Sequence, residues 1–218
     1  MAKFKAVIFD MDGTLLNTLT DIANSVNRGL RELGCPGHSV ESYKQLIGSG
    51  RDVLAQRALP ESRRDASTAE RLLDLINRDY VVHWADNTSL YPGVPEMLDS
   101  LEARNLRMAI LSNKPDEFTQ QMARRMLSKW RFEVVTGAVP GVPVKPHPQA
   151  ARQIAEKMNI VSAEVIYVGD SDVDMQMATA AGMFAVGALW GFRTRGELLA
   201  NGAQAVLSSP LEILKLLD

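Results

Sequence analysis

Residues 6–14 read AVIFDMDGT, a short apolar run that changes abruptly into a polar turn. The first four residues are rich in β-formers, which predicts a buried strand. Asp10 and Asp12 follow it directly, and two carboxylates two residues apart on a bending strand can face one site. Gly13 permits a tight turn. One carboxylate can attack phosphorus while the other acts as acid and base, so this stretch predicts an aspartate nucleophile and its partner.

The pattern of the chain changes near residue 90. Residues 17–90 contain four helical segments with no strand between them, which predicts a small helical bundle. Residues 91–218 alternate strands and helices, which predicts a parallel sheet covered on both faces. We therefore expect an α/β protein. Its Rossmann-like core would comprise residues 1–16 and 91–218, and a small all-helical cap domain, residues 17–90, would be inserted after the first strand.

Three local expectations concern the ends of these elements. Residues 67–70 have the spacing of a capping box, which predicts that a long helix opens there. The strand over residues 107–111 is expected to end before Ser112, and Pro115 is expected at the first position of the next helix. Ser112 would then lie at the start of a helix, where backbone N–H groups form a natural seat for phosphate.

Further polar clusters follow other predicted strands, where ligands bind in open parallel sheets. Residues 112–114 read SNK and offer a hydroxyl and backbone N–H groups. Lys145, held by a neighbouring proline, can set a positive charge against phosphate and carboxylate. Residues 169–174 read GDSDVD, and hard oxygen ligands of this kind suit Mg²⁺. Each cluster alone is compatible with an ordinary helix cap or a solvated loop, but together and in this order they predict one phosphate-handling site.

With these motifs the chain resembles the haloacid dehalogenase superfamily of phosphohydrolases, and within it most closely the phosphoglycolate phosphatase group. The resemblance covers essentially the whole chain, and its core motifs span residues 10–174. It implies that Asp10 is the nucleophile and a Mg²⁺ ligand. Asp12 would be the acid and base, and its backbone carbonyl would also bind Mg²⁺. Asp170 would be the third protein ligand, and Asp174 would support the metal site from close by.

The resemblance also implies the remaining roles. The residues expected to hold the phosphoryl oxygens are Gly13, Ser112 and Asn113. Lys145 would offset the clustered negative charge, because carboxylate and phosphate repel each other. The helical insert would be a mobile cap that closes over the site and excludes water. Arg51, in a loop of that cap, would contact the acid end of the substrate.

The predicted function is Mg²⁺-dependent hydrolysis of a small phosphomonoester, with phosphoglycolate as the leading substrate, through an aspartyl-phosphate. Two alternatives stay open. Arg51 also fits phosphoryl transfer on a sugar phosphate, as in the similar β-phosphoglucomutases. The second alternative is a non-catalytic protein of the same fold that binds a phosphate ligand. The retention of every catalytic carboxylate argues against it. Residues that can also border the site lie in the loop after a late strand: Trp190, Arg193 and Arg195.

The composition of the chain limits which binding partners and which cellular compartment we expect. The chain has 218 residues and a formal net charge of -2, which favours neither nucleic acid nor a membrane surface as a general partner. Its one cysteine, Cys35, allows no intramolecular disulfide. No leader or membrane span is evident, so we expect a cytoplasmic protein. The expected partner is a small phosphorylated metabolite, and the expected assembly is a monomer or a homodimer.

Overall fold

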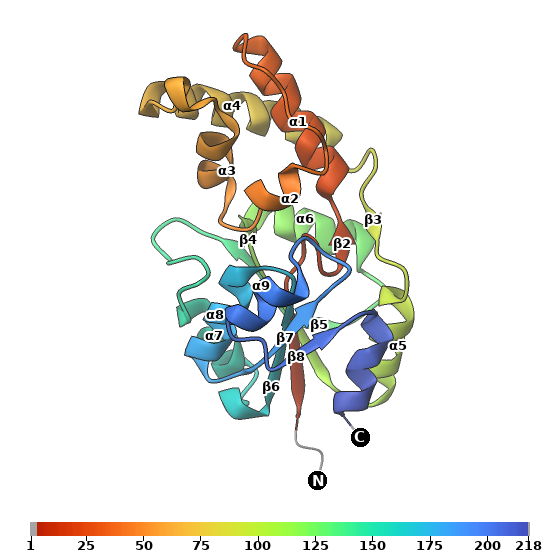
Figure 1. The fold of residues 1–218 in the computed structure, drawn as a ribbon. Coiled ribbons are helices and arrows are strands. Elements are labelled where there is room, and N and C mark those ends of the chain that lie inside the picture. The colour runs from red at the N-terminus through yellow and green to blue at the C-terminus, as the bar shows by residue number, and fades with distance from the viewer. Residues whose placement is uncertain (1–3, 218) are drawn as a thin grey trace. The chain divides into compact units, whose positions relative to one another are not determined.

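A computed structural model of the chain describes residues 4–217, which divide into two compact units. Within this range the core unit holds residues 4–16 and 90–217, and the helical unit is Asn17–Ser89. The chain leaves and re-enters the core through two short strands, β2 (Leu16–Asn17) and β3 (Ser89–Leu90), which pair with each other. The helical unit is therefore an insertion that follows the first strand (Figure 1).

The core unit is built on a six-stranded sheet in the order β5-β4-β1-β6-β7-β8. Its strands are β1 (Ala6–Phe9), β4 (Arg107–Pro115), β5 (Phe132–Ala138), β6 (Val165–Gly169), β7 (Phe184–Ala188) and β8 (Ala205–Leu207). All the pairs between them are parallel. Every residue of β1 is buried, as expected of a central strand covered on both faces. The predicted α/β class with a parallel sheet is confirmed.

Helices cover the sheet because its strands carry apolar side chains on alternate sides. The helices of the core are α5 (Val94–Ala103), α6 (Asp116–Met126), α7 (Gln149–Lys157), α8 (Asp172–Ala181) and α9 (Arg195–Ala200), with 3-10 turns at Ser162–Glu164 and Pro210–Leu216. Ile8 and Tyr167 point to the face where they join one apolar cluster with α7, α8 and α9. Helix α6 packs against β4 and β5, and α5 packs against the last 3-10 turn (Figure 1).

The helical unit consists of α1 (Leu19–Glu32), α2 (Tyr43–Leu46), α3 (Arg51–Ala58) and α4 (Ala66–His83), with a 3-10 turn at Glu61–Arg63. Helices α1 and α4 pack together. The apolar residues Ile22, Val26 and Leu30 of α1 are buried, and Arg28 on that helix makes two 2.6 Å bonds to Asp79 on α4. Across residues 4–217, none of the helices combines the length and the apolar character needed to span a bilayer.

The predicted capping box at residues 67–70 is wrong. Helix α4 begins at Ala66, and its cap is Asp65, whose carboxylate accepts the Thr68 N–H at 2.9 Å. An aspartate cap satisfies the same unpaired N–H groups that a serine cap would. The prediction that a polar side chain caps this helix holds, but the cap is Asp65, two residues before the predicted Ser67.

The predicted end of the strand after residue 111 is also wrong. Strand β4 continues through Ser112 to Pro115, and α6 starts at Asp116. Pro115 is the residue before the helix rather than its first position. Ser112 therefore lies on extended backbone, and any phosphate seat there uses strand N–H groups rather than a helix terminus.

Candidate active site

Asp10 lies at the carboxyl end of β1, in the middle of the sheet. Its N–H donates to the Val168 carbonyl at 2.9 Å, and the residue is only 7% exposed. Its Oδ1 accepts the Met11 N–H at 2.7 Å. The chain then turns at Gly13, where φ is +83°, a value that glycine adopts without strain. The predicted nucleophile is thus a buried carboxylate fixed by the sheet on one side and a turn on the other.

Lys145, in the loop between β5 and α7, contacts two of the aspartates. Its side chain is 2% exposed, and Nζ lies 2.9 Å from Asp10 Oδ1 and 2.7 Å from Asp174 Oδ1. The ammonium group also lies 3.2 Å from the Tyr167 hydroxyl. Burial lowers the pKa of Lys145, but Asp10 and Asp174 raise it more strongly, so the ammonium stays charged. One buried cation therefore serves two buried carboxylates.

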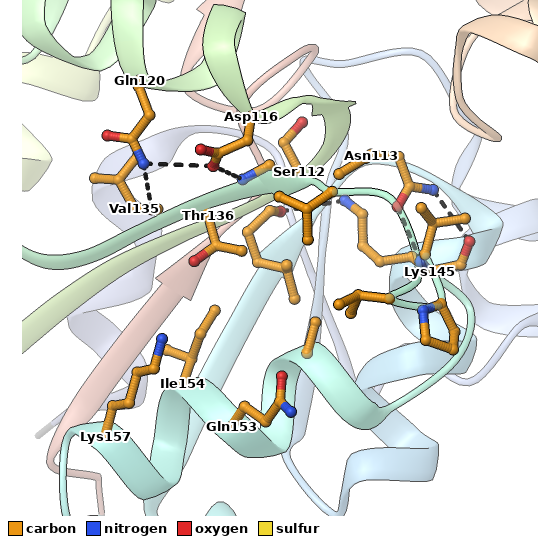
Figure 2. A pocket seen from close by; sticks show the side chains of 18 residues that line it. Ser112, Asn113, Asp116, Gln120, Val135, Thr136, Lys145, Gln153, Ile154 and Lys157 are labelled. Carbon is orange, nitrogen blue, oxygen red and sulfur yellow. Dashed lines mark hydrogen bonds between the residues drawn. The ribbon is translucent and has the colours of Figure 1, made fainter.

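Asn113 holds the backbone that carries this lysine. Its Nδ2 donates to the Lys145 carbonyl at 3.0 Å, and its Oδ1 accepts the Lys145 N–H at 2.9 Å (Figure 2). The side-chain amide of Asn113 is thus engaged with the Lys145 backbone, and a role of Asn113 toward phosphoryl oxygens stays a prediction. Neighbouring Ser112 is 3% exposed, and its Oγ accepts the Lys114 N–H at 3.2 Å.

A cavity of about 350 Å³ lies behind the loop that carries Lys145 (Figure 2). Its walls come from β4, α6, β5, α7 and residues 139–144, and four of the lining residues are valines. Ser112, Asn113 and Lys145 line one part of it, whereas Asp10 and Asp170 do not. The cavity therefore adjoins the lysine loop and does not contain the carboxylate cluster.

Asp170, directly after β6, is 1% exposed and oriented by two donors. The Thr14 hydroxyl donates to Oδ1 at 3.1 Å, and the Phe192 N–H donates to Oδ2 at 2.8 Å. A carboxylate can accept about four hydrogen bonds. Asp170 therefore keeps acceptor capacity for a further ligand.

Asp174, on the first turn of α8, has no such capacity. Its Oδ1 accepts from Lys145 and the Tyr167 hydroxyl, at 2.7 and 3.0 Å. Its Oδ2 accepts from the N–H and the hydroxyl of Ser171, at 3.1 and 2.5 Å. With all four acceptor positions filled, Asp174 suits an indirect role in which it holds Lys145.

Asp10, Asp170 and Asp174 form a cluster in which one ligand atom from each lies within 4.8 Å of the others. Burial raises the pKa of Asp10 to about 7; Lys145 opposes this shift, and Asp174 and Asp12 add to it. Burial, followed by Asp10 and Asp174, raises the pKa of Asp170 well above its usual value. The site thus carries more buried negative charge than its lysine balances. A hard divalent cation such as Mg²⁺, held by Asp10 and Asp170, fits this donor set.

Asp12 is paired with Lys114, a residue to which the sequence analysis gave no role. Lys114 Nζ lies 3.1 and 3.0 Å from the two carboxylate oxygens of Asp12. The two side chains are only 6% and 12% exposed, so this is a largely buried ion pair. Lys114 belongs to the SNK run at residues 112–114, so the sequence held a signal for it.

The loop after β7 also reaches this cluster. Trp190 Nε1 donates to the Thr14 carbonyl at 2.9 Å, so Trp190 does border the site. Arg193 is buried and lies 3.5 Å from Asp172. Arg195 begins α9 and is exposed.

Arg51 belongs to the helical unit, where it opens α3. Its Nη1 donates to Asn77 Oδ1 on α4 at 2.7 Å. The contact orients the guanidinium group within that unit, and the role of Arg51 toward substrate stays a prediction.

Comparison with known proteins decides the family. The sequence profile described as "Haloacid dehalogenase-like hydrolase" matches residues 7–188. The chain belongs to the haloacid dehalogenase-like hydrolase family. The matched region runs from β1 to the end of β7 and therefore includes Asp10, Lys145 and Asp170. The resemblance that the motifs indicated is confirmed.

Individual members of this family are similar over nearly the whole chain. A phosphoglycolate phosphatase of Pseudomonas syringae pv. tomato is 34% identical over 95% of this chain and 77% of its own length. A phosphoglycolate phosphatase of Mannheimia succiniciproducens is 30% identical over 99% of both chains. The crystal structure of a predicted phosphoglycolate phosphatase from Haemophilus somnus superimposes with a TM-score of 0.92 at 28% identity and covers 100% of both chains.

Proposed function

We propose that this haloacid dehalogenase-like hydrolase is a Mg²⁺-dependent phosphatase that cleaves a small phosphomonoester through an aspartyl-phosphate on Asp10. The observation that carries the proposal is the buried Asp10 carboxylate, 2.9 Å from Lys145 and clustered with Asp170 and Asp174. Such a carboxylate is in place to attack phosphorus, because its charge is screened on one side and its position is fixed. The names of similar enzymes support the same reaction.

The proposed reaction has two halves, transfer of the phosphoryl group to Asp10 and hydrolysis of the aspartyl-phosphate, and Asp12 acts in both. An Asp10 carboxylate oxygen attacks phosphorus, and the bond from phosphorus to the ester oxygen breaks. Asp12, in the protonated form that this step requires, gives its proton to that leaving oxygen. In the second half, Asp12 takes a proton from water, the resulting hydroxide attacks phosphorus, and the Asp10 carboxylate is released with inorganic phosphate.

The surrounding residues stabilise charge and position. Lys145 and the backbone near Gly13, Ser112 and Asn113 hold the phosphoryl oxygens, which carry the charge of the transition state. Bound Mg²⁺ would supply further screening between the two anions that must meet. Asp10, the carbonyl of Asp12 and Asp170 are the protein groups that would hold it.

Phosphoglycolate is the substrate we propose, because similar phosphatases over nearly the full chain carry that name. The helical unit would act as the cap that excludes water during the reaction. Arg51 would bind the substrate carboxylate. Replacing Arg51 by Ala should then raise KM for phosphoglycolate about tenfold and leave kcat nearly unchanged. Arg57→Ala, an exposed change on the same helix, is the matched control.

The reaction is tested by phosphate release from a panel that includes phosphoglycolate, sugar phosphates and a generic aryl phosphate, with Mg²⁺ and with EDTA. Activity should need Mg²⁺, and Asp10→Asn should abolish it, whereas Asp99→Asn at an exposed ion pair should not. Mass spectrometry of acid-quenched protein should detect one phosphoryl group, absent in Asp10→Asn. Phosphate release that persists in Asp10→Asn would contradict the proposal. Transfer between sugar positions without phosphate release would favour the mutase alternative instead.

A further inference from the structure

The segment Trp190-Gly191-Phe192, which we call the Trp190 loop, packs directly on Asp170. The Phe192 N–H donates to Asp170 Oδ2 at 2.8 Å. A Cβ placed on Gly191 would lie 2.3 Å from Asp170 Cβ and 2.4 Å from the Gly13 carbonyl oxygen, distances at which no real side chain fits. The backbone of the loop at Gly191 therefore lies so close to Asp170 that only glycine fits there.

The turn after β1 closes on the same carboxylate from another direction. A Cβ on Gly13 would lie 2.2 Å from Asp170 Oδ2, so this position also has no room for a side chain. The next residue, Thr14, donates its hydroxyl to Asp170 Oδ1 at 3.1 Å. Asp170 thus sits between two glycines, and each of its oxygens has one fixed donor.

Trp190 ties these two segments together. Its indole Nε1–H donates to the Thr14 carbonyl at 2.9 Å, across 176 positions of sequence. Since Thr14 and Phe192 supply the two donors to Asp170, this bond and the close contact of Gly191 with Gly13 together set the spacing between them. A shift of either segment would rotate the carboxylate.

We propose that the Trp190 loop is a positioning element, in which Trp190 and Gly191 hold the Asp170 carboxylate in the orientation that binds the divalent cation. The inference rests on the proposed function, because that function requires Asp170 as a ligand. Metal ligands must be held within about 0.5 Å of their working positions. Partners that orient a ligand typically change metal affinity by about 10–100-fold when they are removed.

The experiment measures metal affinity directly rather than activity. Mn²⁺ alone is the probe, since it shares the oxygen ligands of Mg²⁺ and its unbound form is counted by electron paramagnetic resonance. The variants are Trp190→Phe, which removes the indole donor but keeps an aromatic ring, and Gly191→Ala, which forces a side chain against Asp170. Metal-free melting temperatures are recorded in parallel.

The chain offers a matched control for each variant. Trp130 also donates its indole N–H, but away from the cluster and to a carboxylate, with Nε1 2.7 Å from Asp99 Oδ1. Gly196 lies in α9 with no atom within 4 Å of its hypothetical Cβ. Trp130→Phe and Gly196→Ala therefore test the loss of an indole bond and the gain of a methyl group away from the cluster.

We expect Trp190→Phe to raise the Mn²⁺ dissociation constant about 5–20-fold and Gly191→Ala at least tenfold, with both controls within twofold of the unaltered chain. The loss in Trp190→Phe should occur without a larger fall in metal-free melting temperature than Trp130→Phe causes. If Gly191→Ala fails to fold, Trp190→Phe decides the matter. Unchanged affinity in Trp190→Phe, or an equal loss in Trp130→Phe, overturns the inference while the proposed function stands. Failure of the unaltered chain to bind Mn²⁺ or Mg²⁺ overturns the metal site and the inference together.

Discussion

Replacing Lys145 by Met should destabilise the metal-free protein by an amount that depends strongly on pH. The substitution keeps a long apolar stem but removes the ammonium group that lies 2.9 Å from Asp10 and 2.7 Å from Asp174. Both carboxylates are buried, so water cannot take over the role of the lysine. Two anions are then left close together in the interior without a cation.

Two physical estimates set the size of the effect. Removing one partner of a buried ion pair costs about 3–5 kcal/mol, because the remaining charge is uncompensated. For a chain of this length each kcal/mol corresponds to about 2–4 °C, so the melting temperature should fall by about 6–20 °C at pH 7. The variant can relieve the repulsion by folding with one extra proton on the carboxylates. Its deficit should then shrink by up to about 1.4 kcal/mol for each unit that pH falls, so that the deficit at pH 5 is clearly smaller than the deficit at pH 7.

The assay is urea unfolding in EDTA at pH 5, 6 and 7. Lys129→Met is the matched control, because Lys129 lies 2.8 Å from Asp99 but its side chain is 65% exposed. An exposed pair of this kind contributes about 0–1 kcal/mol, and its loss should show no slope over this range. A deficit in Lys145→Met that is below about 1 kcal/mol at pH 7, or that is the same at pH 5 and 7, would refute the reasoning.

Three further outcomes are expected. Asp21→Ala should cost the helical unit about 2–4 kcal/mol in urea unfolding, since the buried carboxylate accepts bonds of 2.8–3.0 Å from the backbone and side chains of Asn87 and Thr88; unchanged amide exchange at those two residues would contradict it. Lys114→Met should lower kcat at least about tenfold, because the Asp12 acid and base loses its partner, while Mn²⁺ affinity stays within twofold; equal kcat would refute this role. Mg²⁺ at a hundred times its dissociation constant should stabilise the protein by about 2.7 kcal/mol over EDTA, and an unshifted thermal transition would argue against the metal site.

The fold was largely predictable from strands whose apolar runs end in polar turns. Helix α5 and strand β8 of the core were not predicted. Helix α5 buries Val94, Met97, Leu98 and Leu101, a helical spacing that the sequence does contain. Strand β8 has only three residues, which is too short for any periodicity to reveal. Strand β8 is recognised in the structure by its parallel pairing with β7, which its own sequence does not reveal.

The contacts within the site were much less predictable than its location. The carboxyl ends of β1, β4 and β6 are adjacent in the sheet, so residues that follow them must converge. Nothing in a linear pattern states that Lys114 pairs with Asp12 while Lys145 pairs with Asp10. The bond from Trp190 to the Thr14 carbonyl is even harder to predict from sequence, because every residue of the chain carries a backbone carbonyl that could accept it.

The three aspartates of residues 169–174 show what the structure adds to a motif. Asp172 is 41% exposed at its side chain and lies 3.5 Å from Arg193. Asp174 is buried with all of its acceptor positions filled by Lys145, Tyr167 and Ser171. Asp170 alone is both buried and only half saturated by hydrogen bonds. Because a metal ion needs lone pairs that no donor has taken, hydrogen-bond accounting separates the residue suited to bind the cation from the one that holds the lysine, although both are the same amino acid four positions apart.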